Sequence, residues 1–128
     1  MNVVDSSAWI EYFTDGPNAG HFAGAVEDVD KLLVPALTIY EVFKWICRER
    51  GETQAVKAVA HMQQGEVVDL DAKLAAYAAR LSLQTKLPMA DSIVHATARV
   101  REATLWTQDD DFEGLDAVKY IAKKKGAK

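Results

Sequence analysis

The sequence contains little cysteine and histidine, which restricts the metal and redox chemistry open to it. Its single cysteine, Cys47, cannot form a disulfide within the chain. The three histidines have no spacing that would complete a zinc site, which needs nitrogen and sulfur ligands. A disulfide scaffold and a zinc centre are therefore not expected, and a metal site would use oxygen ligands.

Long apolar runs are also missing. No stretch approaches the roughly 18 apolar residues of a membrane-spanning helix, because charged residues interrupt the sequence throughout. We find no secretion leader at the start, no internal repeat, no low-complexity segment and no linker. We expect a cytoplasmic protein without membrane association, with one globular domain at 1–122 and a lysine-rich C-terminal tail at 123–128.

The chain lacks an excess of positive charge. It has 15 lysines and arginines against 19 acidic residues, a formal charge of -4. Proteins that bind phosphate backbones through charge alone usually carry a basic surface, so a nucleic-acid partner would require divalent cations that reverse the local sign. The tail lysines are expected to be solvated, with phosphate contact as the alternative; they are Lys123, Lys124, Lys125 and Lys128.

Short apolar runs alternate with helical patterns along the chain. The runs lie at 3–4, 32–34, 67–68 and 105–107, with a possible fifth at 118–121. Strands separated by helices run mostly parallel and are covered on both faces. The sequence therefore predicts an α/β fold: a three-layer α/β/α domain with a mostly parallel sheet of four or five strands flanked by helices.

The helical segments in the middle of the chain have recognisable signals. Thr38 and Glu41 form the T-x-x-E pattern of a capping box, which predicts a helix beginning near Thr38, and Gly51 is its expected end. The following helix is expected to face the core with Val56 and Val59.

Four acidic residues fall where a parallel sheet places its ligand site, beyond the carboxyl ends of the strands. Asp5 ends the first expected strand, Glu41 lies in the first turn after the second, and Asp109 follows the fourth. Asp91 opens the helix that leads to the fourth strand. Carboxylates gathered in a cleft repel one another, and Mg²⁺ or Mn²⁺ removes that cost, so we expect one of these ions.

Each acid also has an ordinary structural interpretation. Asp5 can cap the first helix, and Glu41 can complete the capping box. Asp91 can favour a helix N-terminus by its charge, and Asp109–Asp111 can be a solvated turn. The metal interpretation therefore depends on the position of the four together.

Four segments resemble the signature regions of PIN-domain nucleases: Val-Val-Asp-Ser-Ser at the start, Thr-Ile-Tyr-Glu-Val, Met-Ala-Asp-Ser-Ile-Val-His-Ala, and Leu-Trp-Thr-Gln-Asp-Asp-Asp-Phe. The similarity runs from residue 2 to about residue 115. More narrowly, the length and the Asp-Ser-Ser start resemble the VapC toxins of prokaryotic VapBC toxin–antitoxin modules.

This resemblance implies an Mg²⁺- or Mn²⁺-dependent endoribonuclease. The implied catalytic residues are Asp5, Glu41, Asp91 and Asp109, all of them also metal ligands, with Asp111 as a further ligand. The resemblance leaves open which of Asp109 and Asp111 is the principal fourth acid. Ser6 and Thr107 would support the acids through hydrogen bonds.

The resemblance also implies partners. These are an RNA substrate, a VapB-like antitoxin that blocks the site, and a second copy of the chain, so we expect a homodimer and a hetero-oligomer with the antitoxin. Lys44 and Arg48 are candidate phosphate contacts. Trp45 lies outside the apolar stripe of its helix and is a candidate anchor for the antitoxin peptide.

Two other functions fit parts of the pattern. One is a PIN nuclease that processes RNA outside a toxin–antitoxin module. The other is a phosphoacceptor signalling domain, with Asp69 as the phosphorylated residue. Such a domain needs that aspartate at the end of the middle strand and a pair of acids after the first strand, and Asp5-Ser6-Ser7 does not supply the pair.

Overall fold

The computed structural model describes residues 1–125. Five parallel strands form one sheet in the order β3-β2-β1-β4-β5. The strands are β1 (Asn2–Val4), β2 (Leu32–Pro35), β3 (Glu66–Val68), β4 (Thr104–Thr107) and β5 (Val118–Tyr120). Because all five are parallel, their carboxyl ends lie at one edge of the sheet, as predicted.

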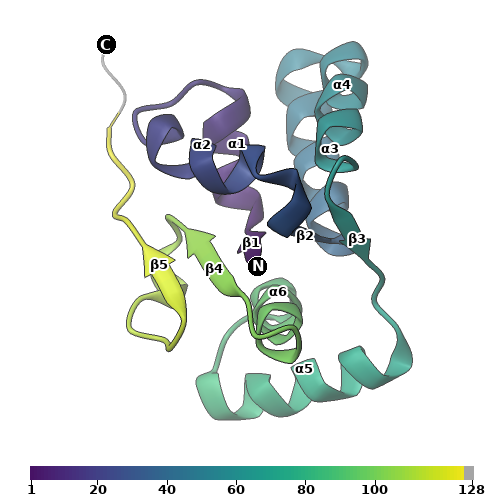
Figure 1. The fold of residues 1–128 in the computed structure, drawn as a ribbon, viewed down its shortest axis with the longest axis vertical. Coiled ribbons are helices and arrows are strands. Elements are labelled where there is room, and N and C mark those ends of the chain that lie inside the picture. The colour runs from purple at the N-terminus through teal and green to yellow at the C-terminus, as the bar shows by residue number, and fades with distance from the viewer. Residues whose placement is uncertain (126–128) are drawn as a thin grey trace.

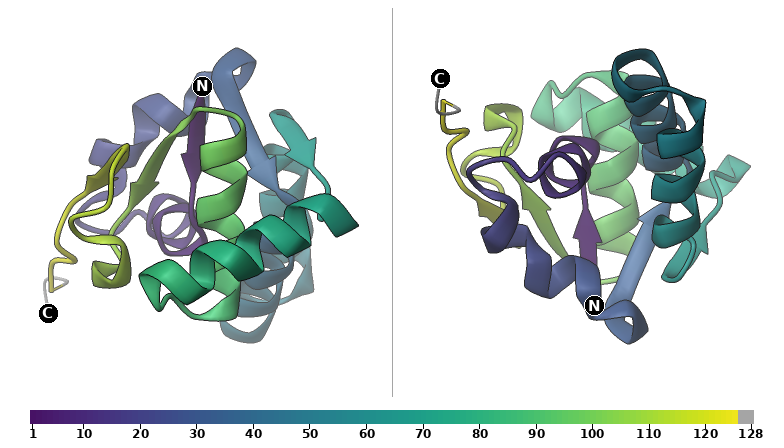
Figure 2. Two further views of the ribbon diagram at one scale, coloured as in Figure 1. Left: turned by 90° about the horizontal axis from the view of Figure 1, so that it is seen from below. Right: turned by 90° about the horizontal axis from the view of Figure 1, so that it is seen from above.

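Helices cover both faces of the sheet (Figure 1). The helices are α1 (Ser6–Phe13), α2 (Ala19–Glu27), α3 (Ala36–Arg50), α4 (Glu52–Met62), α5 (Ala72–Thr85) and α6 (Met89–Val100). The first four lie on one face, and α5 and α6 lie on the other, where α6 runs beside β1 (Figure 2). The expected three-layer α/β/α architecture is confirmed.

Alternation along the strands explains the two layers. Neighbouring side chains of a strand point to opposite faces. Val4 and Leu32 pack against the helices of the first layer. Val3 and Leu33, one position away, pack against α6 together with Leu105. Each central strand is apolar on both faces, as a sheet covered twice requires.

The strand order reverses beside β1. The chain passes from β1 outward to β2 and β3, then returns to the other side of β1 to form β4. In open parallel sheets, the point where the order reverses is where ligands bind, outside the carboxyl ends. Asp5 follows β1 and Asp109 lies just beyond β4, so both flank this point.

The predicted capping box is wrong. Helix α3 begins at Ala36, directly after β2, and Pro35 stands at the N-cap position. Thr38 lies inside the first turn, where its buried hydroxyl donates to the Pro35 carbonyl at 2.6 Å. Glu41 is therefore in the second turn and takes no part in capping. Gly51 ends the helix as expected.

The predicted face of α4 is also wrong. Ala55, Ala58 and Met62 are buried, whereas Val56 is 56% exposed. The helix packs against α3 through the small side chains of Ala55 and Ala58. The larger apolar residues Val56 and Val59 had predicted a different buried face.

The C-terminal segment continues past β5. The expected boundary between a domain at 1–122 and a tail remains a prediction, and Lys128 lies outside the described residues. Among residues 1–125, no helix has the length and apolar character needed to cross a membrane.

Candidate active site

Asp5 is buried at the point where β1 passes into α1. It is 4% exposed and caps the helix, since its Oδ1 accepts hydrogen bonds from the Ala8 N–H at 3.0 Å and the Ser7 hydroxyl at 2.8 Å. Its Oδ2 accepts from the Thr107 hydroxyl at 2.7 Å. Burial raises the pKa of Asp5 to about 6 against the opposing effect of these hydrogen bonds. The carboxyl group is thus held in one orientation at the centre of the sheet edge.

Glu41 reaches the same edge from α3. It is partly buried, and burial is the main reason that its pKa is raised. A hydrogen bond from the Ser6 side chain opposes the shift, while the negative charge of Asp109 adds to it. Ser6 therefore contacts Glu41, and its neighbour Ser7 supports Asp5.

Three aspartates come within metal-binding distance of one another. One carboxylate oxygen each from Asp91, Asp109 and Asp111 lie within 4.8 Å of one another. Asp91 is in the first turn of α6, and Asp109 caps the short 3₁₀ turn Asp110–Phe112 by accepting from the Asp111 N–H at 2.9 Å. Burial, followed by the charge of Asp109, raises the pKa of Asp91 to about 7.

Asp109 is the electrostatic centre of the site. Burial is the main cause of the raised pKa of Asp5, Glu41 and Asp91, and the negative charge of Asp109 adds to all three shifts, whereas Asp111 is exposed and, among these three acids, acts only on Asp91. The structure thus places both aspartates at the site, but in different positions. Asp109 lies among the acids, and Asp111 lies at the rim.

The donor set fits a hard divalent cation. All the clustered ligands are carboxylate oxygens, which Mg²⁺ and Mn²⁺ prefer. Burial is the main cause of the raised pKa values of Asp5 and Asp91, the negative charge of Asp109 adds to both shifts, and a cation would favour the ionised carboxylates. The cluster can therefore hold a metal ion, and Asp91, Asp109 and Asp111 are the residues positioned to do so.

A buried polar network behind Asp109 was not predicted from the sequence. Glu11, Asn18 and Gln108 are all more than nine-tenths buried. The Glu11 carboxylate accepts from the Asn18 N–H at 2.7 Å, and Asn18 Nδ2 donates to Gln108 Oε1 at 3.0 Å and to the Ala122 carbonyl at 3.1 Å. The network joins α1, the turn after it, the residue before Asp109 and the C-terminal segment.

The candidate phosphate contacts lie on an exposed face of α3. The Lys44 ammonium lies 5.7 Å from the centre of the Tyr40 ring, and Arg48 pairs with Glu49 at 3.0 Å. Trp45 is different, because it is half-buried and lines a cavity beside Ser6 and Gln108.

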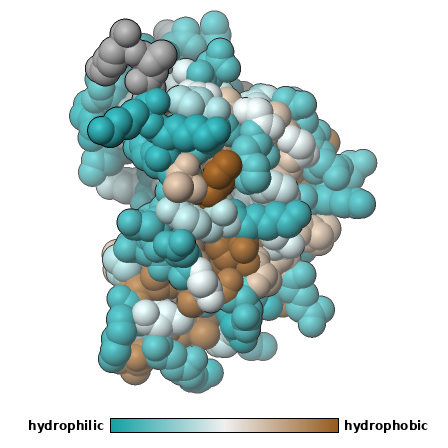
Figure 3. All heavy atoms as spheres, turned by 90° about the vertical axis from the view of Figure 1, so that its left-hand side faces the viewer, coloured by the Kyte–Doolittle hydropathy of each residue, from teal (hydrophilic) through white to brown (hydrophobic). Residues whose placement is uncertain are grey.

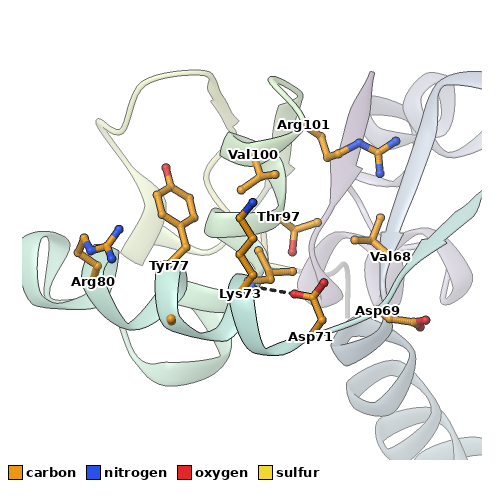
Figure 4. A pocket seen from close by; sticks show the side chains of 11 residues that line it. Val68, Asp69, Asp71, Lys73, Tyr77, Arg80, Thr97, Val100 and Arg101 are labelled. Atoms are coloured by element: carbon orange, nitrogen blue, oxygen red, sulfur yellow. Dashed lines mark hydrogen bonds between the residues drawn. The ribbon is translucent and has the colours of Figure 1, made fainter.

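A separate cavity of about 490 Å³ lies between α5 and α6. Lys73, Tyr77 and Arg80 lie along its wall, and Asp71 caps α5 beside it by accepting from the Leu74 N–H at 2.8 Å (Figure 4). Asp69 is at its rim and follows β3, which is an edge strand. Asp69 thus lacks the central position that a phosphoacceptor aspartate requires, and this cavity contains none of the clustered acids.

Four segments of the chain place acidic residues near the carboxyl edge of a parallel sheet, an arrangement compatible with a metal-dependent nuclease. The family model of the PIN domain matches residues 3–118, which is most of the chain. This chain belongs to the PIN-domain family. No curated protein sequence is detectably similar to it.

Solved structures of low sequence identity share the fold. A toxin–antitoxin complex from Klebsiella pneumoniae matches with a TM-score of 0.78 at 20% identity, over 93% of this chain and 96% of that one. The Mycobacterium tuberculosis toxin VapC20, which cleaves the sarcin-ricin loop, matches with a TM-score of 0.74 at 18% identity, over 88% and 92%. VapBC2 from Rickettsia felis, bound to promoter DNA, matches with a TM-score of 0.70 at 14% identity, over 94% and 97%.

Proposed function

We propose that this protein is an endoribonuclease that hydrolyses RNA phosphodiester bonds with Mg²⁺ or Mn²⁺. The observation that carries the proposal is the convergence of Asp91, Asp109 and Asp111, whose carboxylate oxygens come within ligand distance of one another. Asp5 and Glu41 are close enough for the negative charge of Asp109 to add to their pKa shifts. An acidic site of this kind attracts phosphate only when a cation reverses its sign.

Some residues of the site would bind the metal ion, and others would hold these ligands or the attacking water in position. Asp91, Asp109 and Asp111 would hold the ion, which would lower the pKa of a water molecule and stabilise charge on the phosphate. Asp5, which would be a further ligand, is kept rigid by Thr107 and the start of α1. Glu41, oriented by Ser6, ligates the metal or positions the attacking water. No histidine base is required, because the metal supplies the activation.

We further propose that the nuclease is the toxin of a cytoplasmic toxin–antitoxin pair, which forms a homodimer and is inhibited by a VapB-like antitoxin. Support comes from the similar structures, which include a toxin–antitoxin complex and VapBC2. An antitoxin arginine paired with the exposed Asp111 would neutralise the site in place of the metal.

The enzymatic proposal is tested with purified protein and total RNA. Wild-type protein should cleave RNA with Mg²⁺ or Mn²⁺ and lose activity in chelator, and Asp91→Asn should be inactive while keeping the same far-UV circular dichroism. Equal cleavage by wild type and Asp91→Asn would show that the activity does not come from this site and would contradict the proposal.

The toxin role is tested in cells. Expression of the wild type should arrest growth, Asp91→Asn should not, and co-expression of the neighbouring small gene should restore growth. Cleavage in vitro without growth arrest would favour an RNA-processing nuclease outside a toxin–antitoxin module.

A further inference from the structure

A cavity of about 340 Å³ adjoins the acidic site, and neither the acids nor the fold explains it. Its lining comes from four separate parts of the chain: the first two turns of α1 with Glu11 and Thr14, Trp45 of α3, Gln108 after β4, and Lys123 after β5. Such a convergence of distant segments around a recess is typical of ligand sites.

The cavity shares its walls with the acidic site. Ser6 and Ser7 line it while also hydrogen bonding to Glu41 and Asp5, respectively. Trp45 lies one helical turn after Glu41 and therefore on the same side of α3. A second hollow, lined by Asp109 and Lys123, continues on the other side of Gln108. A molecule in the cavity is thus next to whatever the acids hold.

The lining combines an aromatic surface with fixed polar groups. Trp45 is half-buried and presents an indole ring, while Glu11 and Gln108 are 7% and 5% exposed. The two contacts of Gln108 Nε2, to the Ser7 carbonyl and Glu11 Oε1, are both 3.4 Å, which is long for hydrogen bonds. The amide and the carboxylate therefore retain hydrogen-bonding capacity toward a ligand.

Lys123 adds a positive charge at the mouth. It lines both this cavity and the hollow beside Asp109. The segment that carries it is anchored, since Asn18 Nδ2 donates to the carbonyl of the preceding residue, Ala122, at 3.1 Å. Figure 3 views the side of the molecule that carries β5 and this segment, where the surface is largely hydrophilic, with apolar residues in the middle and at the lower left.

We propose that this cavity is a nucleobase subsite. It takes one base of the RNA next to the phosphate at the acids, with Trp45 stacking on the base, Glu11 and Gln108 contacting its edge, and Lys123 neutralising an adjacent phosphate. A nucleobase has the flat face and the polar edge that this lining complements. An apolar peptide side chain would make no use of the carboxylate and the amide that line the cavity. The proposal rests on the RNA cleavage proposed above.

The base is tested directly by NMR titration with the four nucleoside 5′-monophosphates in the presence of Mg²⁺. The indole N–H signal of Trp45, assigned by its loss in Trp45→Phe, should shift with at least one nucleotide. It should not shift with ribose 5-phosphate, which has the phosphate and no base. A response to none of the nucleotides, or an equal response to ribose 5-phosphate, would overturn the proposal.

The contribution to RNA binding is tested by the KM of cleavage. Trp45→Ala should raise KM roughly 5- to 150-fold, the usual effect of losing one base–aromatic stack. Trp45→Phe keeps an aromatic ring, so its KM should stay much closer to the wild-type value. Lys123→Ala should raise KM more at low salt than at high salt. Tyr77→Ala is the matched control, because Tyr77 is a half-buried aromatic lining the distant cavity between α5 and α6. Its KM should stay at the wild-type value.

The two proposals fail in distinguishable ways. If the wild type does not cleave RNA, the proposed enzymatic function fails. If the wild type cleaves RNA and folded Trp45→Ala keeps its KM, only the nucleobase subsite fails. A Trp45→Ala protein that keeps its KM but no longer binds the product of the neighbouring gene would assign the cavity to a peptide instead.

Discussion

The Thr107 hydroxyl donates to Asp5 Oδ2 at 2.7 Å and accepts from the Asp109 N–H at 2.9 Å. One buried side chain thus joins the acid that ends β1 to the acid that follows β4. Thr107 belongs to β4, which pairs with β1, so the contact helps to fix the distance between Asp5 and Asp109.

Replacing Thr107 with valine removes this link at nearly constant volume. We expect Thr107→Val to weaken Mg²⁺ binding about 10- to 100-fold, as measured for hydrogen-bond partners of metal ligands. The measurement is the Mg²⁺ concentration that gives half-maximal RNA cleavage. Thr107→Ser keeps the hydroxyl and should remain near the wild type, and a serine variant as impaired as valine would show that the hydrogen bonds are unimportant.

Neutralising Asp109 should separate activity from stability. Asn can still cap the turn through its side-chain oxygen, but it removes the charge that acts on Asp5, Glu41 and Asp91. We expect Asp109→Asn to abolish cleavage and to stabilise the metal-free protein by about 1–2 kcal/mol.

Denaturant unfolding in chelator measures that stability. Asp111→Asn is the matched control, since Asp111 is exposed and should give a smaller gain. An Asp109→Asn protein less stable than the wild type would contradict the electrostatic role of Asp109.

The stability of the metal-free protein should depend on pH through Asp5 and Asp91. Burial raises the pKa of Asp5 to about 6 and that of Asp91 to about 7, both from 3.8. Between pH 3.8 and these raised pKa values, the folded protein binds more protons than the unfolded chain. The free energy of unfolding therefore falls as pH rises through this range. We expect the free energy of unfolding in chelator to decrease from about pH 4 to about pH 7.

Excess Mg²⁺ should reduce this pH dependence near neutrality, because the cation stabilises the ionised carboxylates in the folded state. Urea unfolding at several pH values, with and without Mg²⁺, provides the comparison. Metal-free stability that increases steadily from pH 4 to pH 7 would contradict the assignment of these shifts to the site.

Asn18 should contribute to stability although it lies outside the acidic cluster. Asn18→Ala removes the donor that serves both Gln108 Oε1 and the Ala122 carbonyl. We expect a loss of about 1–3 kcal/mol, the usual cost of leaving buried polar groups without partners. Gln84→Ala, at an exposed position of α5, is the control for thermal unfolding and should change little. Equal melting temperatures for the two variants would refute the role of the network.

Local sequence signals were sufficient for much of the fold. Val3-Val4 before Asp5 predicted the first strand, and Asp5 was a candidate cap of the following helix, which the structure confirms. These features depend on neighbours within a few residues, so the chain specifies them wherever it folds. The four acids were proposed as site residues for the same reason, because each stands beside an element that its own segment specifies, and their function remains a prediction.

Other features depend on contacts between distant segments. The capping box was wrong because α3 starts directly after β2, where Thr38 bonds back to Pro35 instead of standing outside the helix. The face of α4 follows from its close packing against α3. The hydrogen bond between Asn18 and Gln108 joins residues 90 positions apart, so no local pattern could reveal it.

The sequence by itself predicted the parallel sheet and the acids proposed at its carboxyl edge, because apolar periodicity and cap residues are local. Only the tertiary structure decided how these acids lie relative to one another. The order of the strands puts β1 beside β4. The negative charge of Asp109 therefore adds to the pKa shifts of the other acids, whereas Asp111 lies at the rim. The same order brings the segment with Lys123 beside Trp45, and the physical reason is that proximity across a sheet follows from strand pairing and not from position along the chain.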